Sequence, residues 1–208
     1  MGIKYAVLTG DIIRSSAISP EQRVILNNTL NALLNEYKDI FNFKSELYRG
    51  DSFQCLVFDP KDSLRLALLI KSFIRHLDFP EMMDARIAIG IGNIDHQEDS
   101  LANSHGEAFA LSGRALDSIK DSKQTLTIST ADKYNSELQI ESFLLDTIML
   151  KNTAAQSAVI NLKLRGFTEI QIAKALGIMQ SAVNQRSTGA NWNAIHLFVN
   201  HFEKLYTS

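Results

Sequence analysis

The sequence predicts a mixed α+β protein, in which an α/β sandwich of the ferredoxin-like or palm type precedes a C-terminal all-α unit. Strands and helices interleave through residues 1–135 with one internal hairpin, an order that is typical of this sandwich. From residue 136 onward the apolar periodicity is helical only. A chain of 208 residues can bury a domain of about 150 residues and a small appendage. We therefore expect an α/β domain at 1–135, a helical linker at 136–152 and a helical domain at 153–208.

Each element of the sandwich has a local signature in the sequence. Ser19 and Pro20 begin a long helix, because serine caps the first turn and proline costs nothing at the first helical position. Gly113 lies inside a later helix at a cost of about 1 kcal/mol relative to alanine, which suggests close packing or a bound group nearby. In chain order, the expected elements are a strand at 5–12, a helix at 19–41, a hairpin at 47–58, a helix from about 63, a strand at 86–92, a helix at 106–116 and a strand at 124–129. The strand at 86–92 ends in small residues, which indicates that something approaches its backbone closely.

The charge of the chain is nearly balanced overall but unevenly distributed. The net charge is −2, whereas residues 153–208 contain five basic and two acidic residues and so carry +3. A basic tail on an acidic body is compatible with contact to a phosphate backbone. No window has the ~18 uninterrupted apolar residues of a membrane span, and the N-terminus lacks a secretory apolar region. The single cysteine, Cys55, reads as a buried apolar residue, and we expect a cytoplasmic protein with no membrane partner.

The segment 167–186 resembles a helix-turn-helix. Such a pair needs a small residue where the helices cross, a glycine at the turn and an aliphatic residue where the second helix presses on the first. Ala173, Gly177 and Val183 occupy these places, four and then six residues apart, and Thr168 can cap the first helix.

The second helix of this pair would enter the major groove of double-stranded DNA. Five side chains would contact base edges and phosphates, namely Gln180, Ser181, Asn184, Gln185 and Arg186. A homodimer would double these contacts, which suits a charge as small as +3. The alternative is a helical hairpin that serves only dimerisation.

Two Gly-Asp dipeptides each follow an apolar strand and place Asp11 and Asp51 at strand ends. If the two strands are neighbours, the carboxylates lie several ångströms apart, and at ~5 Å with an effective dielectric near 20 they repel by roughly 3 kcal/mol. A shared proton or a lysine would relieve this repulsion, but a hard divalent cation such as Mg²⁺ or Mn²⁺ does so best and brings phosphates with it. The alternative is that both aspartates are exposed turn residues.

Residues 3–130 resemble a class III nucleotide cyclase domain. In that family an Asp-Ile pair ends the first strand and a Gly-Asp pair lies in the hairpin, and Asp11 and Gly50-Asp51 match them. The resemblance implies that the two aspartates hold Mg²⁺ over a triphosphate. Ser16 matches the hydroxyl residue that ends the family's phosphate-binding loop.

The resemblance extends to the following strand and helix. Gly106 to Arg114 are similar to the family's Gly-x-x-x-Asn-x-x-x-Arg helix, so Gly106 would lie near the bound nucleotide and Arg114 would stabilise the pentavalent phosphorus. The family's ribose-orienting asparagine is Ala110 here, and its purine-reading lysine falls at Leu47. Metal and phosphate positions are kept while base and ribose positions are lost.

The whole chain is similar to the SatD family of bacterial proteins. The matching residues are Thr9 to Ile12, Ala175 to Arg186 and the pair Asn191-Trp192. The hypothesis is a transcription regulator whose tail binds DNA and whose degenerate cyclase-like body senses a nucleotide or other phosphorylated ligand with a divalent cation. The alternatives are an active divergent nucleotidyl cyclase or transferase with the tail as a targeting module, and a body that is only a dimerisation scaffold.

Overall fold

The structure is a computed structural model that describes residues 3–48, 51–79, 82–98 and 100–207, and the backbone alone at Ser16. Within these ranges no helix is long and apolar enough to cross a membrane. The elements in chain order are β1 (Tyr5–Ile13), η1 (Ser15–Ala17), α1 (Pro20–Tyr37), β2 (Phe43–Tyr48), β3 (Ser52–Val57), η2 (Pro60–Asp62), α2 (Ser63–His76), β4 (Asp84–Gly92), η3 (Leu101–Asn103), α3 (Glu107–Ile119), β5 (Leu126–Thr130), α4 (Asn135–Met149), α5 (Ala154–Leu164), α6 (Glu169–Leu176), α7 (Gln180–Gly189) and α8 (Trp192–Tyr206).

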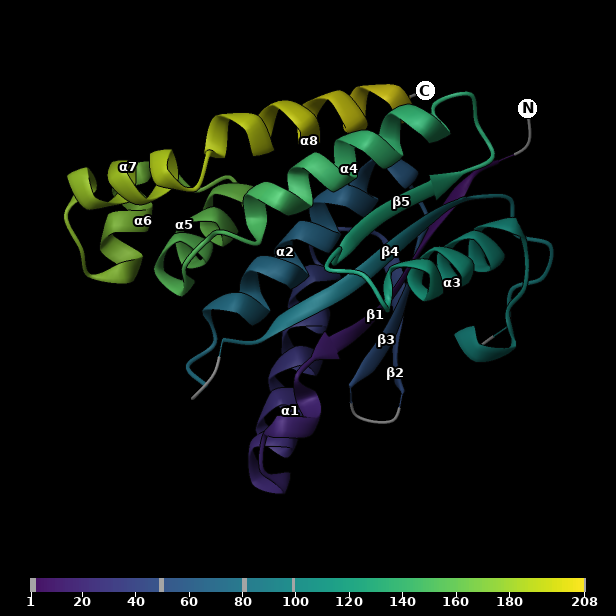
Figure 1. The fold of residues 1–208 in the computed structure, drawn as a ribbon, viewed down its shortest axis with the longest axis horizontal. Coiled ribbons are helices and arrows are strands. Elements are labelled where there is room, and N and C mark those ends of the chain that lie inside the picture. Colours follow the sequence, from purple (N-terminus) through teal and green to yellow (C-terminus); the bar gives the residue numbers. More distant parts are fainter. Residues whose placement is uncertain (1–2, 49–50, 80–81, 99, 208) are drawn as a thin grey trace.

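Five strands in the described ranges form one mixed sheet in the order β2-β3-β1-β4-β5 (Figure 1). Neighbouring strands are antiparallel except β4 and β5, which are parallel. β3 thus lies between the parallel strands β1 and β2 that α1 connects, and β1 lies between the parallel strands β3 and β4 that α2 connects. This is the split βαβ arrangement of the ferredoxin-like fold. The predicted α+β sandwich is confirmed, with β5 as an additional edge strand.

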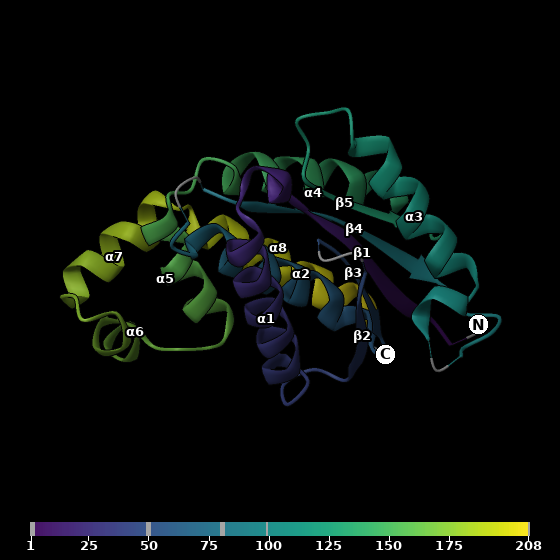
Figure 2. The same ribbon diagram turned by 90° about the horizontal axis from the view of Figure 1, so that it is seen from below.

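The two faces of the sheet carry different helices. Successive side chains of a strand point to opposite faces, so Ala6 and Leu8 face one side and Val7 the other. Ala6 and Leu8 lie in the main apolar core together with α1 and α2, whereas Val7 packs with Ala108 of α3 (Figure 2). Cys55 is fully buried in the main core, as expected, and burial raises the pKa of its thiol to about 12.

The helix starts follow the caps that the sequence predicts. The Ser19 side chain accepts a hydrogen bond from the Gln22 backbone, Gln22 bonds back to Ser19, and Pro20 stands at the first helical position. Thr168 caps α6 in the same reciprocal way with Gln171. Each such cap satisfies backbone donors that the first turn leaves without an intrahelical partner.

Two glycines of the sheet and its covering helix differ sharply in their surroundings. A Cβ at Gly90 would lie 2.3 Å from both the Ala108 carbonyl oxygen and the Ser112 backbone nitrogen. The expected close approach to the strand at 86–92 is therefore present, and the approaching group is α3. At Gly113 a Cβ would have nothing within 4 Å beyond its own helix, so the expected close packing at this glycine is wrong.

This contrast predicts opposite effects for the same substitution. Gly90→Ala will destabilise the protein by about 1–3 kcal/mol, because the methyl group must push α3 away from β4. Gly113→Ala will stabilise it by about 0.5–1 kcal/mol, because alanine costs less entropy in a helix and here meets open space. Urea denaturation of both variants beside the wild type measures the two changes, and a change of the same sign in both would contradict the packing described.

The C-terminal helices divide between two apolar clusters. α5 and α8 contribute to the main core, whereas α6 and α7 project from the body and pack with α5 around a second, small cluster (Figure 1). The buried amide of Asn161 in α5 donates to the Leu69 carbonyl at 2.9 Å and to Ser72 Oγ at 3.1 Å, which fixes α5 to α2. The predicted boundaries after residues 135 and 152 stay predictions. The core residues from α5 and α8 are Ile160, Leu164, Ile195, Val199 and Phe202, and the small cluster is Val159, Ile172 and Val183.

Candidate functional site

The backbones of the two predicted aspartates lie next to each other at one end of the sheet. In the register of β1 and β3, Asp11 is opposite Ser52, the residue that follows Asp51. The Ile12 backbone nitrogen donates to the Asp51 carbonyl oxygen at 2.8 Å, so the two strand ends are held directly against each other. Residues 40 positions apart in the chain are thereby placed side by side.

Asp11 has an ionic partner that the sequence analysis missed. Arg86 on β4 is directly opposite Asp11, and its Nη1 donates to both carboxylate oxygens at 3.1 Å. About a fifth of each side chain is exposed, 18% for Arg86 and 23% for Asp11, so the pair is partly shielded from solvent. A protein cation that the sequence analysis did not name, the Arg86 guanidinium, therefore neutralises Asp11, and the expected metal-binding role of Asp11 and Asp51 stays a prediction.

Asp51 is held by the turn that follows β1. Ser15 Oγ donates to Asp51 Oδ2 at 2.9 Å, and the Ser52 hydroxyl lies 3.4 Å from Oδ1. Ser15 is positioned by η1, which Arg14 enters in a left-handed conformation with φ of 68°. The hydroxyl that contacts the carboxylate thus belongs to Ser15, and the expected role of Ser16 toward a phosphate stays a prediction. The Ser16 side chain and Gly50 lie outside the described residues.

The α3-facing side of the sheet is polar around Asp11. Thr9 lies on the same face as Asp11, with its hydroxyl 2.9 Å from Ser112 Oγ and 3.3 Å from the Gln54 amide. Lys120, at the end of α3, has a raised pKa, chiefly because of its hydrogen bond to Asp117 and in smaller part because of the charge of Asp11. Lys120 therefore interacts electrostatically with Asp11, although its hydrogen-bond partner is Asp117.

Gly106 and Arg114 have different positions relative to this end of the sheet. Gly106 caps α3 with φ of 147°, and a Cβ there would lie 2.7 Å from Ile94 Cα, so the glycine is required by the packing of the loop. Arg114 is exposed on α3, and within the described part of the chain no hydrogen bond or ion pair engages it. Their expected roles toward a nucleotide stay predictions.

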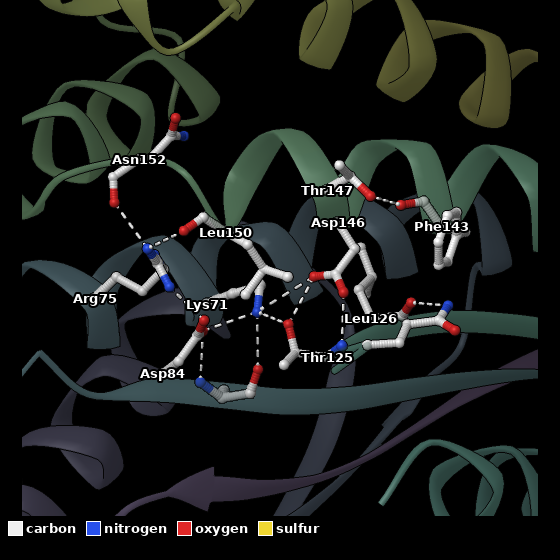
Figure 3. A network of polar contacts seen from close by, with 12 residues as sticks. Lys71, Arg75, Asp84, Thr125, Leu126, Phe143, Asp146, Thr147, Leu150 and Asn152 are labelled. Atoms are coloured by element: carbon white, nitrogen blue, oxygen red, sulfur yellow. Dashed lines mark hydrogen bonds and ion pairs between the residues drawn. The ribbon is translucent and has the colours of Figure 1, made fainter. Parts of the chain in front are cut away.

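A buried charge network links the helices α2 and α4 to the start of β4 (Figure 3). Lys71 of α2 is fully buried and donates to Asp84 Oδ1 at 2.8 Å, to the Ala85 carbonyl at 3.1 Å and to Thr125 Oγ1 at 2.5 Å. Asp146 of α4 lies 3.6 Å from the same ammonium and accepts the Thr125 hydroxyl at 2.6 Å. Arg75 donates to the second oxygen of Asp84 and to two carbonyls at the end of α4. The network joins α2, β4, β5 and α4, and we assign it a structural role.

α6 and α7 form a tightly connected pair of helices. Gly177 ends α6 in the left-handed conformation, with φ of 63°, and α7 begins three residues later. Val183 of α7 is fully buried against Ile172, and Ala173 packs beside them, so the crossing uses the residues that the spacing predicts. Of the five side chains expected to contact DNA, those of Gln180, Ser181, Asn184 and Gln185 are exposed and that of Arg186 is half-buried.

Comparisons with known proteins find similarity in structure only. No protein-family model and no curated protein sequence matches the chain. The chain is similar to the guanylyl cyclase domain of the RhoGC fusion protein from Blastocladiella emersonii, with a TM-score of 0.49 and 16% identity over 66% of this chain and 83% of that one. It is also similar to a bacterial light-regulated adenylyl cyclase, with a TM-score of 0.46 and 15% identity over 61% of this chain and 76% of that one.

A third similar structure is the GGEEF domain of a diguanylate cyclase from Vibrio cholerae, with a TM-score of 0.45 and 13% identity over 62% of this chain and 84% of that one. At these identities and scores no activity follows from the similarity. The α+β assignment rests on the strand order and register described above.

Proposed function

We propose that the chain is a DNA-binding regulator in which α7 contacts double-stranded DNA and the α+β body binds a phosphorylated ligand together with a divalent cation. The observation that carries the proposal is the outward polar face of α7 on a short helix pair that projects from the body (Figure 1). α6 and α7 would act as a helix-turn-helix, with α7 as the recognition helix. This organisation is the one implied by the resemblance to the SatD family.

The side chains of α7 suit base-edge contacts. Asn184 and Gln185 can each donate and accept hydrogen bonds, as bidentate recognition of adenine requires. The hydrogen bond from Lys163 lowers the pKa of Glu169 in α6, and Gln180 and Asn184 of α7 make smaller contributions in the same direction. An acidic group beside the recognition face opposes non-specific phosphate binding, so we expect affinity to depend on sequence-specific contacts and on two copies in a homodimer.

The site at the end of the sheet supports the ligand half of the proposal. Asp11 and Asp51 offer the hard oxygen donors that Mg²⁺ or Mn²⁺ prefers, and these residues would hold the cation. Arg86 supplies positive charge directly beside Asp11, and Lys120 interacts electrostatically with the same carboxylate, as recognition of phosphate oxygens requires. When bound, the cation would neutralise phosphate charge that the protein cations leave uncompensated.

DNA recognition by α7 can be tested by selection from a random duplex library, which requires no defined operator. Selection, followed by fluorescence anisotropy at several salt concentrations, will yield an enriched sequence that the wild type binds. Asn184→Ala and Gln185→Ala will each weaken this binding by about 5- to 100-fold, since a good bidentate base contact contributes about 1–3 kcal/mol. Arg186→Ala will also weaken binding, and it will lower the salt slope by about one if it contacts a phosphate.

Asn193→Ala is the matched control, because Asn193 is an exposed residue of α8 outside the recognition helix. It should leave affinity unchanged. Failure to enrich any sequence, or equal binding by the wild type and the α7 variants, would show that the helix pair serves another purpose, such as dimerisation.

A further inference from the structure

Three side chains that can ligate a metal ion converge between α4 and α8. Glu137 and Glu141 lie one turn apart on α4, and His201 projects from α8, which runs beside α4 (Figure 1). One ligand atom from each residue lies within 4.8 Å of the other two. His201 Nε2 is 3.4 Å from Glu137 Oε1 and 3.9 Å from Glu141 Oε1.

Two of these polar atoms are left without hydrogen bonds. Glu141 Oε2 and His201 Nε2 are both buried, and within the described part of the chain neither has a hydrogen-bond partner. Buried polar atoms in folded proteins normally have a hydrogen-bond partner. Two such atoms without a partner at one place therefore indicate a missing binding partner. Burial also raises the pKa of Glu141, and the charge of Glu137 adds to the increase while His201 opposes it. A cation at this point would satisfy the unpaired atoms and relieve the repulsion between the two glutamates.

We propose that Glu137, Glu141 and His201 bind a divalent transition-metal ion of the Zn²⁺ class, and that this ion ties α8 to α4. Zinc binds histidine nitrogen and carboxylate oxygen at 2.0–2.2 Å in tetrahedral geometry, which separates neighbouring ligand atoms by about 3.4 Å. The measured separations of 3.4 and 3.9 Å are close to this value. The imidazole nitrogen disfavours Mg²⁺, which prefers an all-oxygen set, so this site differs in kind from the one at Asp11 and Asp51.

The site is accessible to an ion from solvent. The side chains of Glu137, Glu141 and His201 are 49%, 31% and 41% exposed, respectively. Water can therefore supply a fourth ligand, as in metal sites with three protein ligands. Because α7 leads directly into α8, an ion that holds α8 on α4 also restrains the helix pair α6–α7 relative to the body.

Titration of the metal-free full-length protein with Zn²⁺ tests this proposal. Isothermal titration calorimetry should show binding that both His201→Ala and Glu141→Gln weaken by about tenfold or more. The melting temperature should rise by about 5–10 °C when Zn²⁺ is ~100-fold above the dissociation constant, and EDTA should reverse the rise. Bound Co²⁺ should show the visible absorption of a tetrahedral ion, and the same two variants should abolish that absorption.

The control variant is His196→Ala, since His196 lies on the same helix but stacks on Trp192 outside the cluster. It should bind Zn²⁺ as the wild type does. Glu141→Gln keeps the shape of the side chain, so it remains informative if His201→Ala fails to fold. No binding of Zn²⁺ by the wild type, or equal binding by the wild type and both cluster variants, overturns the proposal. Binding that Mg²⁺ reproduces at equal concentration overturns it as well.

Discussion

Replacement of Asp84 by asparagine will destabilise the protein by about 3–5 kcal/mol, the largest effect on stability that we expect from a single isosteric change. Asp84 neutralises both Lys71 and Arg75, one through each carboxylate oxygen, in a region where all three side chains are almost completely buried. Without the carboxylate, Lys71 keeps Asp146 at 3.6 Å as its one ionic partner among the described residues, and Arg75 keeps two backbone carbonyls but no carboxylate. Thermal and urea denaturation, monitored by circular dichroism, will measure the loss.

The matched control for this experiment is Asp59→Asn. Asp59 forms an ion pair with Lys61 near the start of α2, and both side chains of that pair are well exposed. An exposed pair contributes little because water and salt screen it, so no measurable change is expected. Similar losses in the Asp84 and Asp59 variants would show that burial does not govern the network.

A double-mutant cycle refines the interpretation of the Asp84 variant. Lys71→Met removes a buried cation that Asp84 compensates. The loss of unfolding free energy in the double variant Lys71→Met/Asp84→Asn should therefore be smaller than the sum of the losses in the two single variants. The coupling reports how much of the single-variant loss comes from a charge left without its partner. Strict additivity would contradict the pairing seen in Figure 3.

Asp51→Asn will reduce the affinity of the body for a nucleoside triphosphate with Mn²⁺ by about 100-fold or more, the largest effect on binding that we expect. The substitution removes a charged oxygen donor for the cation while it keeps the shape and the hydrogen bond from Ser15. Titration of each common nucleoside triphosphate in the presence of Mn²⁺, followed by calorimetry, will measure the change. Asp39→Asn is the control, because Asp39 is exposed at the end of α1, outside the site.

Two other results would redirect the interpretation of the body. No binding of any nucleotide by the wild type, with or without Mn²⁺, would remove the ligand-sensing half of the proposed function and leave the body as a scaffold. Chromatographic detection of a cyclic or transferred product that Arg114→Ala abolishes would identify the body as an active enzyme. Asp11→Asn will not stabilise the fold, because Asp11 is paired with Arg86 and its loss leaves that guanidinium partly buried without its partner.

Local patterns in the sequence predicted most of the elements and several of their ends. Serine and proline at residues 19 and 20 and threonine at residue 168 cap helices as expected, because capping depends on atoms a few residues apart. The alternation of apolar residues and the order of strands and helices were sufficient for the ferredoxin-like arrangement. The position of Gly177 at the left-handed end of α6 also follows from local chemistry.

Contacts between segments that are far apart in the sequence were harder to predict. The buried Lys71 and Arg75 lie one turn apart within the apolar helix α2, and that irregularity was the one local sign of the network in Figure 3. The cluster of Glu137, Glu141 and His201 was still harder to predict, since His201 is 60 residues or more from the two glutamates in the sequence. A histidine on one helix and glutamates on another form a candidate metal site only when the two helices are adjacent.

The sequence by itself determined the α+β class, the helical tail, the turn between α6 and α7, and the presence of aspartates at two strand ends, because each depends on short-range periodicity or on backbone preferences of single residues. Only the tertiary structure decided that Arg86 neutralises Asp11 and that the Ser15 hydroxyl contacts Asp51. The reason is that strand register selects which side chains face each other. Register is set by the packing of the whole sheet against its helices, which no local stretch of sequence contains.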